Sequence, residues 1–448
     1  MPWSVCGSGN RGARSSDRRT VVAVAPDDVR ITAEPDPTGW PPIGSVRPRT
    51  PAQITDSGII IGAETLDRDH ANYSAYAKYL SPPLGAKRAR IQSGWAKTEQ
   101  RPGVYSWGWL DTIVNDAVAR GVRPWLQTSD GNPIYPGGGG TGLGSPLPSS
   151  SDALAAWDSW VTAMVTRYGD RVDEWEIWNE PSADAATYAD FYVRTAERVR
   201  VVQPDAVLFG GAVASVHTDC IIGFLERVRD LGKLGLVDGV TYHPYAYNPD
   251  SNYVAVDSLR TRVAAVSPSI VVRQGENGAP SQQGGFGALN DHPWTERKRA
   301  KWDTRRVLGD LGRGISTSVF TMSNMRYSQA PSGLNSKGLV RTNIDHSVRY
   351  AKQAYYAVQA FRKAGTQQQA VAVWLSGAIP ADTTTTTAVT FTFPSGNFAD
   401  PVYVDLRTAT VYDIPAANWT VSGTSHTFTS VPVYDSPILI ADRSVVPT

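Results

Sequence analysis

The sequence predicts an α/β protein, a (β/α)8 TIM barrel followed by an antiparallel β-sandwich. Between Gly58 and Lys363, short apolar runs alternate eight times with segments of helical periodicity, and eight such units close a barrel. After Ala364 come Thr-rich segments in which apolar and polar residues alternate, as in antiparallel sheets. An open doubly wound sheet would carry a glycine-rich phosphate turn after its first strand, and Gly62-Ala63-Glu64 is not one.

The barrel elements follow from these two periodicities in chain order. The clearest helix has apolar residues at Leu110, Ile113, Val114, Ala117 and Val118, spaced as one helix face, and ends before a glycine. Strands are expected at 59–61, 89–91, 124–126, 175–181, 207–209, 240–242, 270–272 and 319–321. The other helices are expected around 73–80, 154–165, 188–202, 222–231, 256–266, 297–311 and 351–363.

The flanking segments complete the expected domain organisation. Residues 1–20, rich in Gly, Ser and Arg, are expected to be a disordered leader. Residues 21–56 hold two β-like pieces, 21–24 and 29–32, expected to pack on the C-terminal β-domain. The barrel is expected over 57–364 and the β-sandwich over 365–448. Strands of the sandwich are expected at 370–375, 388–393, 402–406, 419–421 and 438–440.

Composition argues against several functional classes. The net charge of +1 gives no electrostatic reason to expect nucleic acid or an anionic membrane as partner. No apolar run reaches 18 residues, so no membrane-spanning helix is expected. The basic run over 297–306 lies in a helical pattern and is interpreted as a solvated helix face.

Cysteine usage and the N-terminus bear on compartment. With only Cys6 and Cys220, neither a disulfide framework nor a metal site is expected. Residues 1–20 lack the apolar segment of a secretory signal, so a cytoplasmic protein is expected; secretion stays open if the start is misassigned.

Two carboxylates stand at the ends of predicted strands. Trp175–Pro181 begins as an apolar strand and closes on Asn179, Glu180 and Pro181, where proline cannot extend a sheet ladder. Glu276 follows the buried strand 270–272, the seventh of the series. Polar residues at the C-terminal ends of barrel strands indicate catalysis, and strands four and seven can face each other across the mouth.

Two carboxylates across a sugar pocket are the minimal set for cleaving a glycosidic bond. One protonates the leaving oxygen, and the other attacks the anomeric carbon; retention of configuration needs them roughly 5–5.5 Å apart. Gly275, without a side chain, is expected to let a sugar approach Glu276 closely.

The motifs resemble those of the clan A retaining glycoside hydrolases, most closely family 39, the β-xylosidase and α-L-iduronidase group. Strand four carries the clan motif, and Glu276 stands on strand seven. The matching stretches are Arg90–Trp95, Gly103–Trp107, Trp175–Pro181, Val237–Tyr245 and Gln274–Asn277. The resemblance also implies a β-sandwich beside the barrel and no metal or organic cofactor.

The resemblance assigns roles by position. It implies that Glu180 is the acid/base and Glu276 the nucleophile. Asn179 would bind the sugar 2-hydroxyl, a contact that strengthens in the oxocarbenium-like transition state. Arg90 would keep Glu276 ionised, although a purely structural ion pair is the alternative. His243 and Tyr245 would match the clan's aromatic pair, with Tyr245 steadying Glu276; His243 as an ordinary core histidine is the alternative.

Other positions bear on the sugar. Gln92 stands where the family often has histidine, and residues 320–327, after strand eight, contain no tryptophan, which clan members usually place under the sugar. Trp95 and Asn132 are further candidates for sugar contact, with core packing the alternative for Trp95.

The expected substrate is a carbohydrate, with a β-xyloside first and exo action. An α-L-arabinofuranoside or another uncommon glycoside is the alternative. An alternative of another class is a sugar-binding protein on an inactive scaffold; retention of both Glu180 and Glu276 argues against it. The sequence indicates no oligomeric state.

Overall fold

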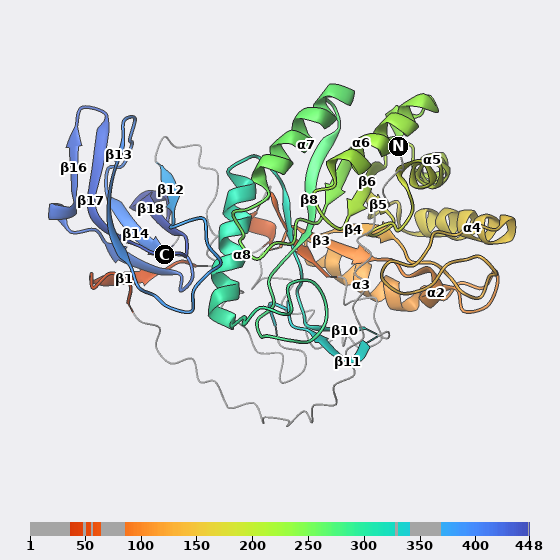
Figure 1. The fold of residues 1–448 in the computed structure, drawn as a ribbon, viewed down its shortest axis with the longest axis horizontal. Coiled ribbons are helices and arrows are strands. Elements are labelled where there is room, and N and C mark those ends of the chain that lie inside the picture. The colour runs from red at the N-terminus through yellow and green to blue at the C-terminus, as the bar shows by residue number, and fades with distance from the viewer. Residues whose placement is uncertain are drawn as a thin grey trace.

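The computed structural model describes residues 36–47, 51–54, 57–63, 86–327, 330–340, 369–446 and 448. Its centre is a closed barrel of parallel strands in the order β2-β3-β4-β5-β6-β7-β8-β9, ringed by helices (Figure 1). The predicted α/β barrel is confirmed. Its strands are β2 (Ile59–Gly62), β3 (Arg88–Gln92), β4 (Arg123–Thr128), β5 (Glu174–Ile177), β6 (Val207–Val213), β7 (Gly239–Tyr242), β8 (Val271–Asn277) and β9 (Thr317–Val319).

Three of the helices begin where a side chain caps the first turn. Ser150, Asp184 and Thr295 each accept a hydrogen bond from the backbone N–H three residues on. The helices are α2 (Trp95–Thr98), α3 (Gly108–Ala119), α4 (Ser151–Tyr168), α5 (Ala185–Val202), α6 (Thr218–Asp230), α7 (Tyr253–Val266) and α8 (Glu296–Leu311). The predicted helices at 73–80 and 351–363 lie outside the described residues.

The starts of the barrel strands are filled by aromatic rings and a paired charge. Trp125, Phe209 and Ile60 form one buried cluster. The Arg273 guanidinium lies 4.7 Å from the Trp125 ring centroid and 4.0 Å from that of Phe209. Its Nη1 donates to Glu174 at 2.7 Å. This packing closes the barrel at the N-terminal ends of its strands. A functional site is therefore expected at the other end, where the strand C-termini lie.

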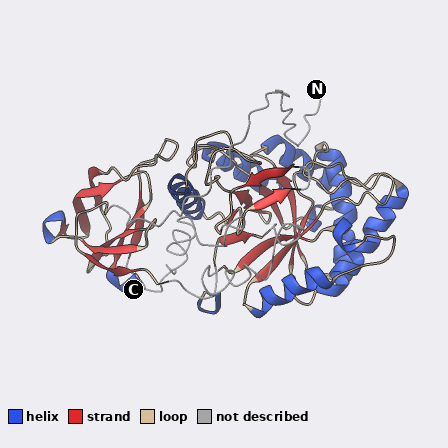
Figure 2. Cartoon of the chain, turned by 90° about the horizontal axis from the view of Figure 1, so that it is seen from below, coloured by secondary structure: helices blue, strands red, loops and turns tan. Residues whose placement is uncertain are grey.

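The C-terminal part consists of two antiparallel sheets at one end of the molecule (Figure 2). One has the order β1-β15-β14-β18-β12, and the other β13-β17-β16. The strands are β1 (Pro42–Ser45), β12 (Ala370–Val373), β13 (Thr387–Phe393), β14 (Pro401–Asp405), β15 (Thr410–Asp413), β16 (Trp419–Ser422), β17 (Ser425–Val433) and β18 (Ile438–Asp442). A hairpin of β10 (Met325–Tyr327) and β11 (Ala330–Asn335) follows the barrel.

Two features of these sheets differ from the sequence analysis. β15 and β17 were not predicted, and β17 contains Pro432, a residue that argues against a strand. From the N-terminal region, β1 pairs antiparallel with β15. The β-like pieces 21–24 and 29–32 lie outside the described residues.

Helix α8 lies between the barrel and the C-terminal sheets (Figure 1). The interpretation of its basic run as a solvated face is wrong, because this face is covered from both sides. Lys301 is buried, donates to the Ala381 carbonyl at 2.9 Å and pairs with Asp435 at 2.5 Å. Arg305 is also buried and pairs with Asp250. Buried charges need partners of this kind.

Two further findings concern the cysteines and membranes. Cys220 is disulfide-bonded, which corrects the expectation that the cysteines stay unpaired; Cys6 lies outside the described residues. Among the described helices, none combines the length and apolar character needed to cross a membrane.

The burial of Lys301 predicts that this side chain stabilises the fold. Replacing Lys301 by Ala removes the cation paired with Asp435 and the donor to the Ala381 carbonyl, so the free energy of unfolding should fall by about 3 kcal/mol. Lys298→Ala on the same helix is the control, because its ammonium reaches only the Pro293 carbonyl at an exposed position. Chemical denaturation measures both variants. Equal losses would show that Lys301 does not stabilise the contact.

Candidate active site

The loop after β5 holds the first predicted carboxylate in an unusual backbone conformation. The strand ends at Ile177, earlier than Pro181 suggested, because Trp178 adopts a left-handed φ of 71°. Glu180 also has a positive φ, of 44°. Left-handed backbone costs roughly 1–2 kcal/mol per non-glycine residue and persists where the surroundings over-determine it, often at functional sites.

Packing and hydrogen bonds hold this loop. The Trp178 ring is buried, with ring centroids 5.7 Å from Trp157 and 5.6 Å from Phe191. The Glu180 N–H donates to the Ala212 carbonyl, at the end of β6, at 2.9 Å. The Ala212 N–H in turn donates to Thr241 Oγ1 on β7 at 3.1 Å. The position of Glu180 is therefore fixed from the neighbouring strand ends.

Arg90, on β3, lies at the centre of the site and is fully buried. Its Nη1 donates to Glu276 Oε2 at 3.1 Å, and its Nη2 to Asn179 Oδ1 at 3.0 Å. Its Nε donates to Glu176 Oε2 at 2.7 Å. The carboxylates of Glu176 on β5 and Glu276 on β8, with the amide of Asn179 after β5, thus converge on the guanidinium that β3 supplies.

Glu276 is surrounded by donors. Besides Arg90, the Tyr245 hydroxyl donates to Glu276 Oε1 at 2.6 Å. A guanidinium and a phenol together stabilise an ionised carboxylate, which is the state a nucleophile needs. The structure therefore places Arg90 and Tyr245 where the resemblance implied, against Glu276.

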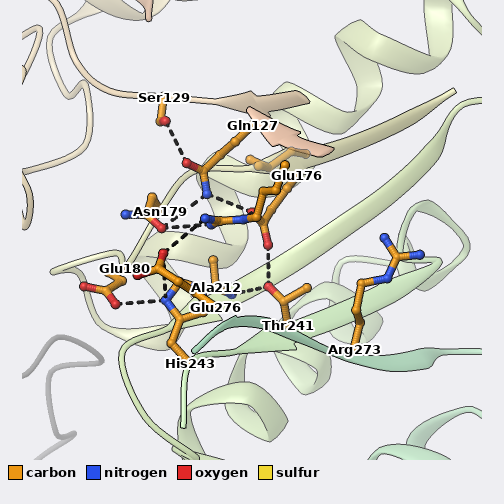
Figure 3. A network of polar contacts seen from close by, with 12 residues as sticks. Gln127, Ser129, Glu176, Asn179, Glu180, Ala212, Thr241, His243, Arg273 and Glu276 are labelled. Carbon is orange, nitrogen blue, oxygen red and sulfur yellow. Dashed lines mark hydrogen bonds and ion pairs between the residues drawn. The ribbon is translucent and has the colours of Figure 1, made fainter. Parts of the chain in front are cut away.

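Glu180 is held by His243. The two side chains face each other (Figure 3), and His243 Nδ1 lies 2.8 Å from Glu180 Oε1 and 3.8 Å from Glu276 Oε2. Burial opposes a charge on this ring, but the carboxylates of Glu276 and Glu180 outweigh it and raise the pKa of His243 above its usual value. In any state that forms the hydrogen bond, one proton lies between Nδ1 and Oε1, where an acid/base group can use it.

The two carboxylates lie close together. One oxygen of Glu180, one oxygen of Glu276 and one ring nitrogen of His243 all lie within 4.8 Å of one another. This separation matches the roughly 5–5.5 Å of retaining glycosidases and is shorter than the roughly 6.5–9.5 Å of inverting ones. A histidine and two carboxylates are also donors that Zn²⁺ accepts, so metal independence is a property to test.

Sequence reasoning missed the residues behind this pair. Glu176 on β5, Gln127 on β4 and Thr241 on β7 are fully buried polar residues. Gln127 Nε2 donates to Glu176 Oε2 at 2.8 Å, and Thr241 Oγ1 donates to Glu176 Oε1 at 2.5 Å. Their signal in the sequence is a polar residue within an otherwise apolar strand. Glu176, for example, stands between Trp175 and Ile177.

Trp95 and Asn132 are both buried and both bonded to Glu99. Trp95 is fully buried, stacks on Tyr135 with ring centroids 5.6 Å apart, and donates through Nε1 to Glu99 at 2.6 Å. Asn132 is also buried and donates to the Glu99 carbonyl at 2.8 Å. The structure thus places both in the packing beneath the α2 segment rather than against Glu180 or Glu276. Gln92 is buried at the end of β3.

The interpretation of Gly275 is corrected. A β-carbon on Gly275 would lie 3.1 Å from His243 Nε2 and 3.1 Å from the Thr241 β-carbon. The missing side chain therefore makes room for the His243 ring inside the barrel rather than for a sugar.

A buried lysine, Lys337, lies near the site in the segment after β11. Lys337 Nζ donates to the Ala288 carbonyl at 2.6 Å and lies 5.4 Å from the centroid of the Tyr245 ring. Burial lowers the pKa of Lys337 to about 7, although the charge of Glu276 acts in the opposite direction. Lys337 thus contributes a titratable cation beside Tyr245, which binds the predicted nucleophile.

A cavity of about 520 Å³ lies beside the loop that follows Glu180. Its walls include Leu147, Ser182, Phe191 and Arg194, between the segment before α4 and helix α5. Neither Glu180 nor Glu276 lines it, so the paired carboxylates, not this cavity, define the candidate active site.

This chain is similar to known proteins in structure but not detectably in sequence. No family model matches the sequence, and no curated protein matches it. A family 39 glycoside hydrolase from the gut symbiont Bacteroides cellulosilyticus WH2 superposes with a TM-score of 0.64 at 18% identity, over 86% of this chain and 81% of that one. The family 39 enzyme of Xanthomonas axonopodis pv. citri gives 0.60 at 16% identity, over 86% and 93%.

A monomeric β-xylosidase from Caulobacter crescentus CB15 superposes with a TM-score of 0.60 at 17% identity, over 89% of this chain and 97% of that one. The chain has the fold of the family 39 glycoside hydrolases in clan A. The resemblance indicated by the strand-end motifs is confirmed for this glycosidase fold, including its C-terminal β-domain.

The lowered pKa of Lys337 predicts a pH-dependent effect on stability. The unfolded chain binds this proton more tightly than the folded one, so the cost of burying Lys337 is full below about pH 7 and fades toward about pH 10. Lys337→Met should therefore gain stability relative to wild type most at pH 6, on the order of 1–4 kcal/mol, and least at pH 9.5. Chemical denaturation at both pH values measures the difference. A stability difference that does not change with pH would contradict this account.

Proposed function

We propose that this protein is a retaining glycoside hydrolase that cleaves O-glycosidic bonds by double displacement. The observation that carries the proposal is the pair Glu180 and Glu276: one oxygen of each lies within 4.8 Å of the other, on the β5 and β8 sides of the barrel mouth. That spacing leaves room for an anomeric carbon next to Glu276 but not for a water between sugar and base.

The different surroundings of the two carboxylates assign their roles. Glu276, which accepts from Arg90 and Tyr245, attacks the anomeric carbon and forms a glycosyl-enzyme. Glu180, which shares a proton with His243, protonates the leaving oxygen and then takes a proton from the attacking water. Asn179, whose side-chain oxygen accepts from Arg90, is proposed to hydrogen-bond the sugar 2-hydroxyl.

The proposed substrate is a β-xyloside cleaved by exo action. Support comes from the likeness of fold to a β-xylosidase and from the clan motifs, with an α-L-arabinofuranoside or another uncommon glycoside as the alternative on the same scaffold. The proposed partner is a carbohydrate alone, without nucleic acid or membrane, and the proposed localisation is cytoplasmic. No cofactor is proposed, so EDTA should leave the rate unchanged.

A panel of aryl glycosides tests the proposal. Wild-type protein should hydrolyse one sugar class, with aryl β-xylosides first. Glu180→Gln should slow substrates with poor leaving groups by about 10²–10⁴-fold, because they need proton assistance, and should slow activated aryl glycosides less. Added azide should restore turnover of activated substrates by attacking the glycosyl-enzyme without needing a general base.

Glu99→Gln provides the control, because Glu99 is a buried carboxylate tied to Trp95 and Tyr135 away from the pair. It should lose stability without the dependence on the leaving group. The proposal would be overturned if Glu180→Gln hydrolysed substrates with poor leaving groups as fast as the wild type. It would also be overturned if the wild type hydrolysed no glycoside.

A further inference from the structure

Glu176 is a buried carboxylate that the mechanism above does not use. It is fully buried, and it accepts hydrogen bonds from three side chains on three strands. The donors are Arg90 on β3, Gln127 on β4 and Thr241 on β7. Its partners therefore include Arg90, which binds Glu276, but neither proposed catalytic carboxylate itself; Figure 3 shows Glu176 with Gln127 and Thr241.

The geometry fixes the orientation of Arg90. A guanidinium is planar, so anchoring Nε sets the directions of Nη1 and Nη2. Glu176 Oε2 holds Nε at 2.7 Å, and this leaves Nη1 facing Glu276 and Nη2 facing Asn179. Gln127 Nε2 lies 3.3 Å from Asn179 Oδ1, so Glu176 and Asn179 are also joined through Gln127.

The charges around Arg90 also indicate that Glu176 acts on Glu276 through Arg90. Arg90 carries one positive charge, and two carboxylates bind it, Glu176 at 2.7 Å and Glu276 at 3.1 Å. Without Glu176 the whole cation would face Glu276 alone in a buried site, where charge interactions are strong. A carboxylate paired that tightly is a poorer nucleophile.

We propose that Glu176 is a positioning residue that orients Arg90 and, through it, places Glu276 for attack and Asn179 for the sugar 2-hydroxyl. This inference rests on the proposed glycosidase function. Thr241 supports it by donating to the second Glu176 oxygen while its hydroxyl also accepts from the Ala212 N–H, beside the Glu180 loop.

The chain offers a matched control two residues earlier on the same strand. Glu174 is also a largely buried carboxylate in ion pairs, accepting from Arg88 at 3.1 Å and Arg273 at 2.7 Å. Its partners lie at the closed end of the barrel, away from Glu276. Glu174→Gln and Glu176→Gln each replace a paired carboxylate by a near-isosteric amide, so both should lower stability.

Only Glu176→Gln should change catalysis. We expect kcat/KM on an aryl glycoside to fall by about 10²-fold, the scale of a small misplacement of reacting groups. On the matching 2-deoxy glycoside the loss should shrink to about tenfold, because Asn179 has no 2-hydroxyl to bind. Thr241→Val should give a smaller loss, and Thr241→Ser, which keeps the hydroxyl, should restore the rate. Equal losses on both substrates, or equal behaviour of Glu174→Gln and Glu176→Gln, would overturn the proposal.

A structural measurement keeps the test independent of the proposed function. Crystal structures of the two variants should show the Arg90 guanidinium rotated out of its wild-type orientation in Glu176→Gln, drawn onto Glu276 and away from Asn179, and unmoved in Glu174→Gln. An unmoved Arg90 in Glu176→Gln would overturn the positioning role whether or not the wild type hydrolyses glycosides. Absence of hydrolysis by wild type, with Arg90 rotated in the variant, would instead contradict only the glycosidase proposal.

Discussion

The buried guanidinium of Arg90 is the interaction on which the site depends. It is fully buried and bonded to Glu176 on β5, to Asn179 in the loop after β5 and to Glu276 on β8. Removing such a charge from water costs several kcal/mol, and only well-placed partners offset this cost. Closure of the barrel supplies those partners, because parallel strands end at one edge and their polar residues meet there.

The rest of the structure supports this centre from two sides. Beneath it, the Arg273–Glu174 pair and the rings of Trp125 and Phe209 close the barrel. Beside it, packed tryptophan and phenylalanine rings hold the left-handed backbone at Trp178, which carries Glu180 toward His243. The strain in this loop is thus balanced by packing outside the site, as is common where function needs an unfavourable backbone.

Sequence periodicity predicted the fold well, because apolar runs and helical spacing report burial directly. Glu180 could be found because it comes soon after β5, and Glu276 because it lies near the C-terminal end of β8, although the predicted strand stopped at residue 272 and β8 runs on to Asn277. Glu176 was missed because an inward-facing polar residue within a strand looks the same, in one sequence, as a polar residue facing outward. The burial of Lys301 was also missed: its helix is covered by sheets far away in the chain.

The most direct test of the account is to trap the covalent intermediate. A 2-deoxy-2-fluoro glycoside with a good leaving group, of the sugar found by the aryl glycoside panel, should inactivate the protein and label one peptide, the one containing Glu276. Proton NMR of a normal substrate should show the retained anomer first, since two inversions restore the configuration. A label on another residue, or the inverted anomer appearing first, would contradict the assignment of both carboxylates.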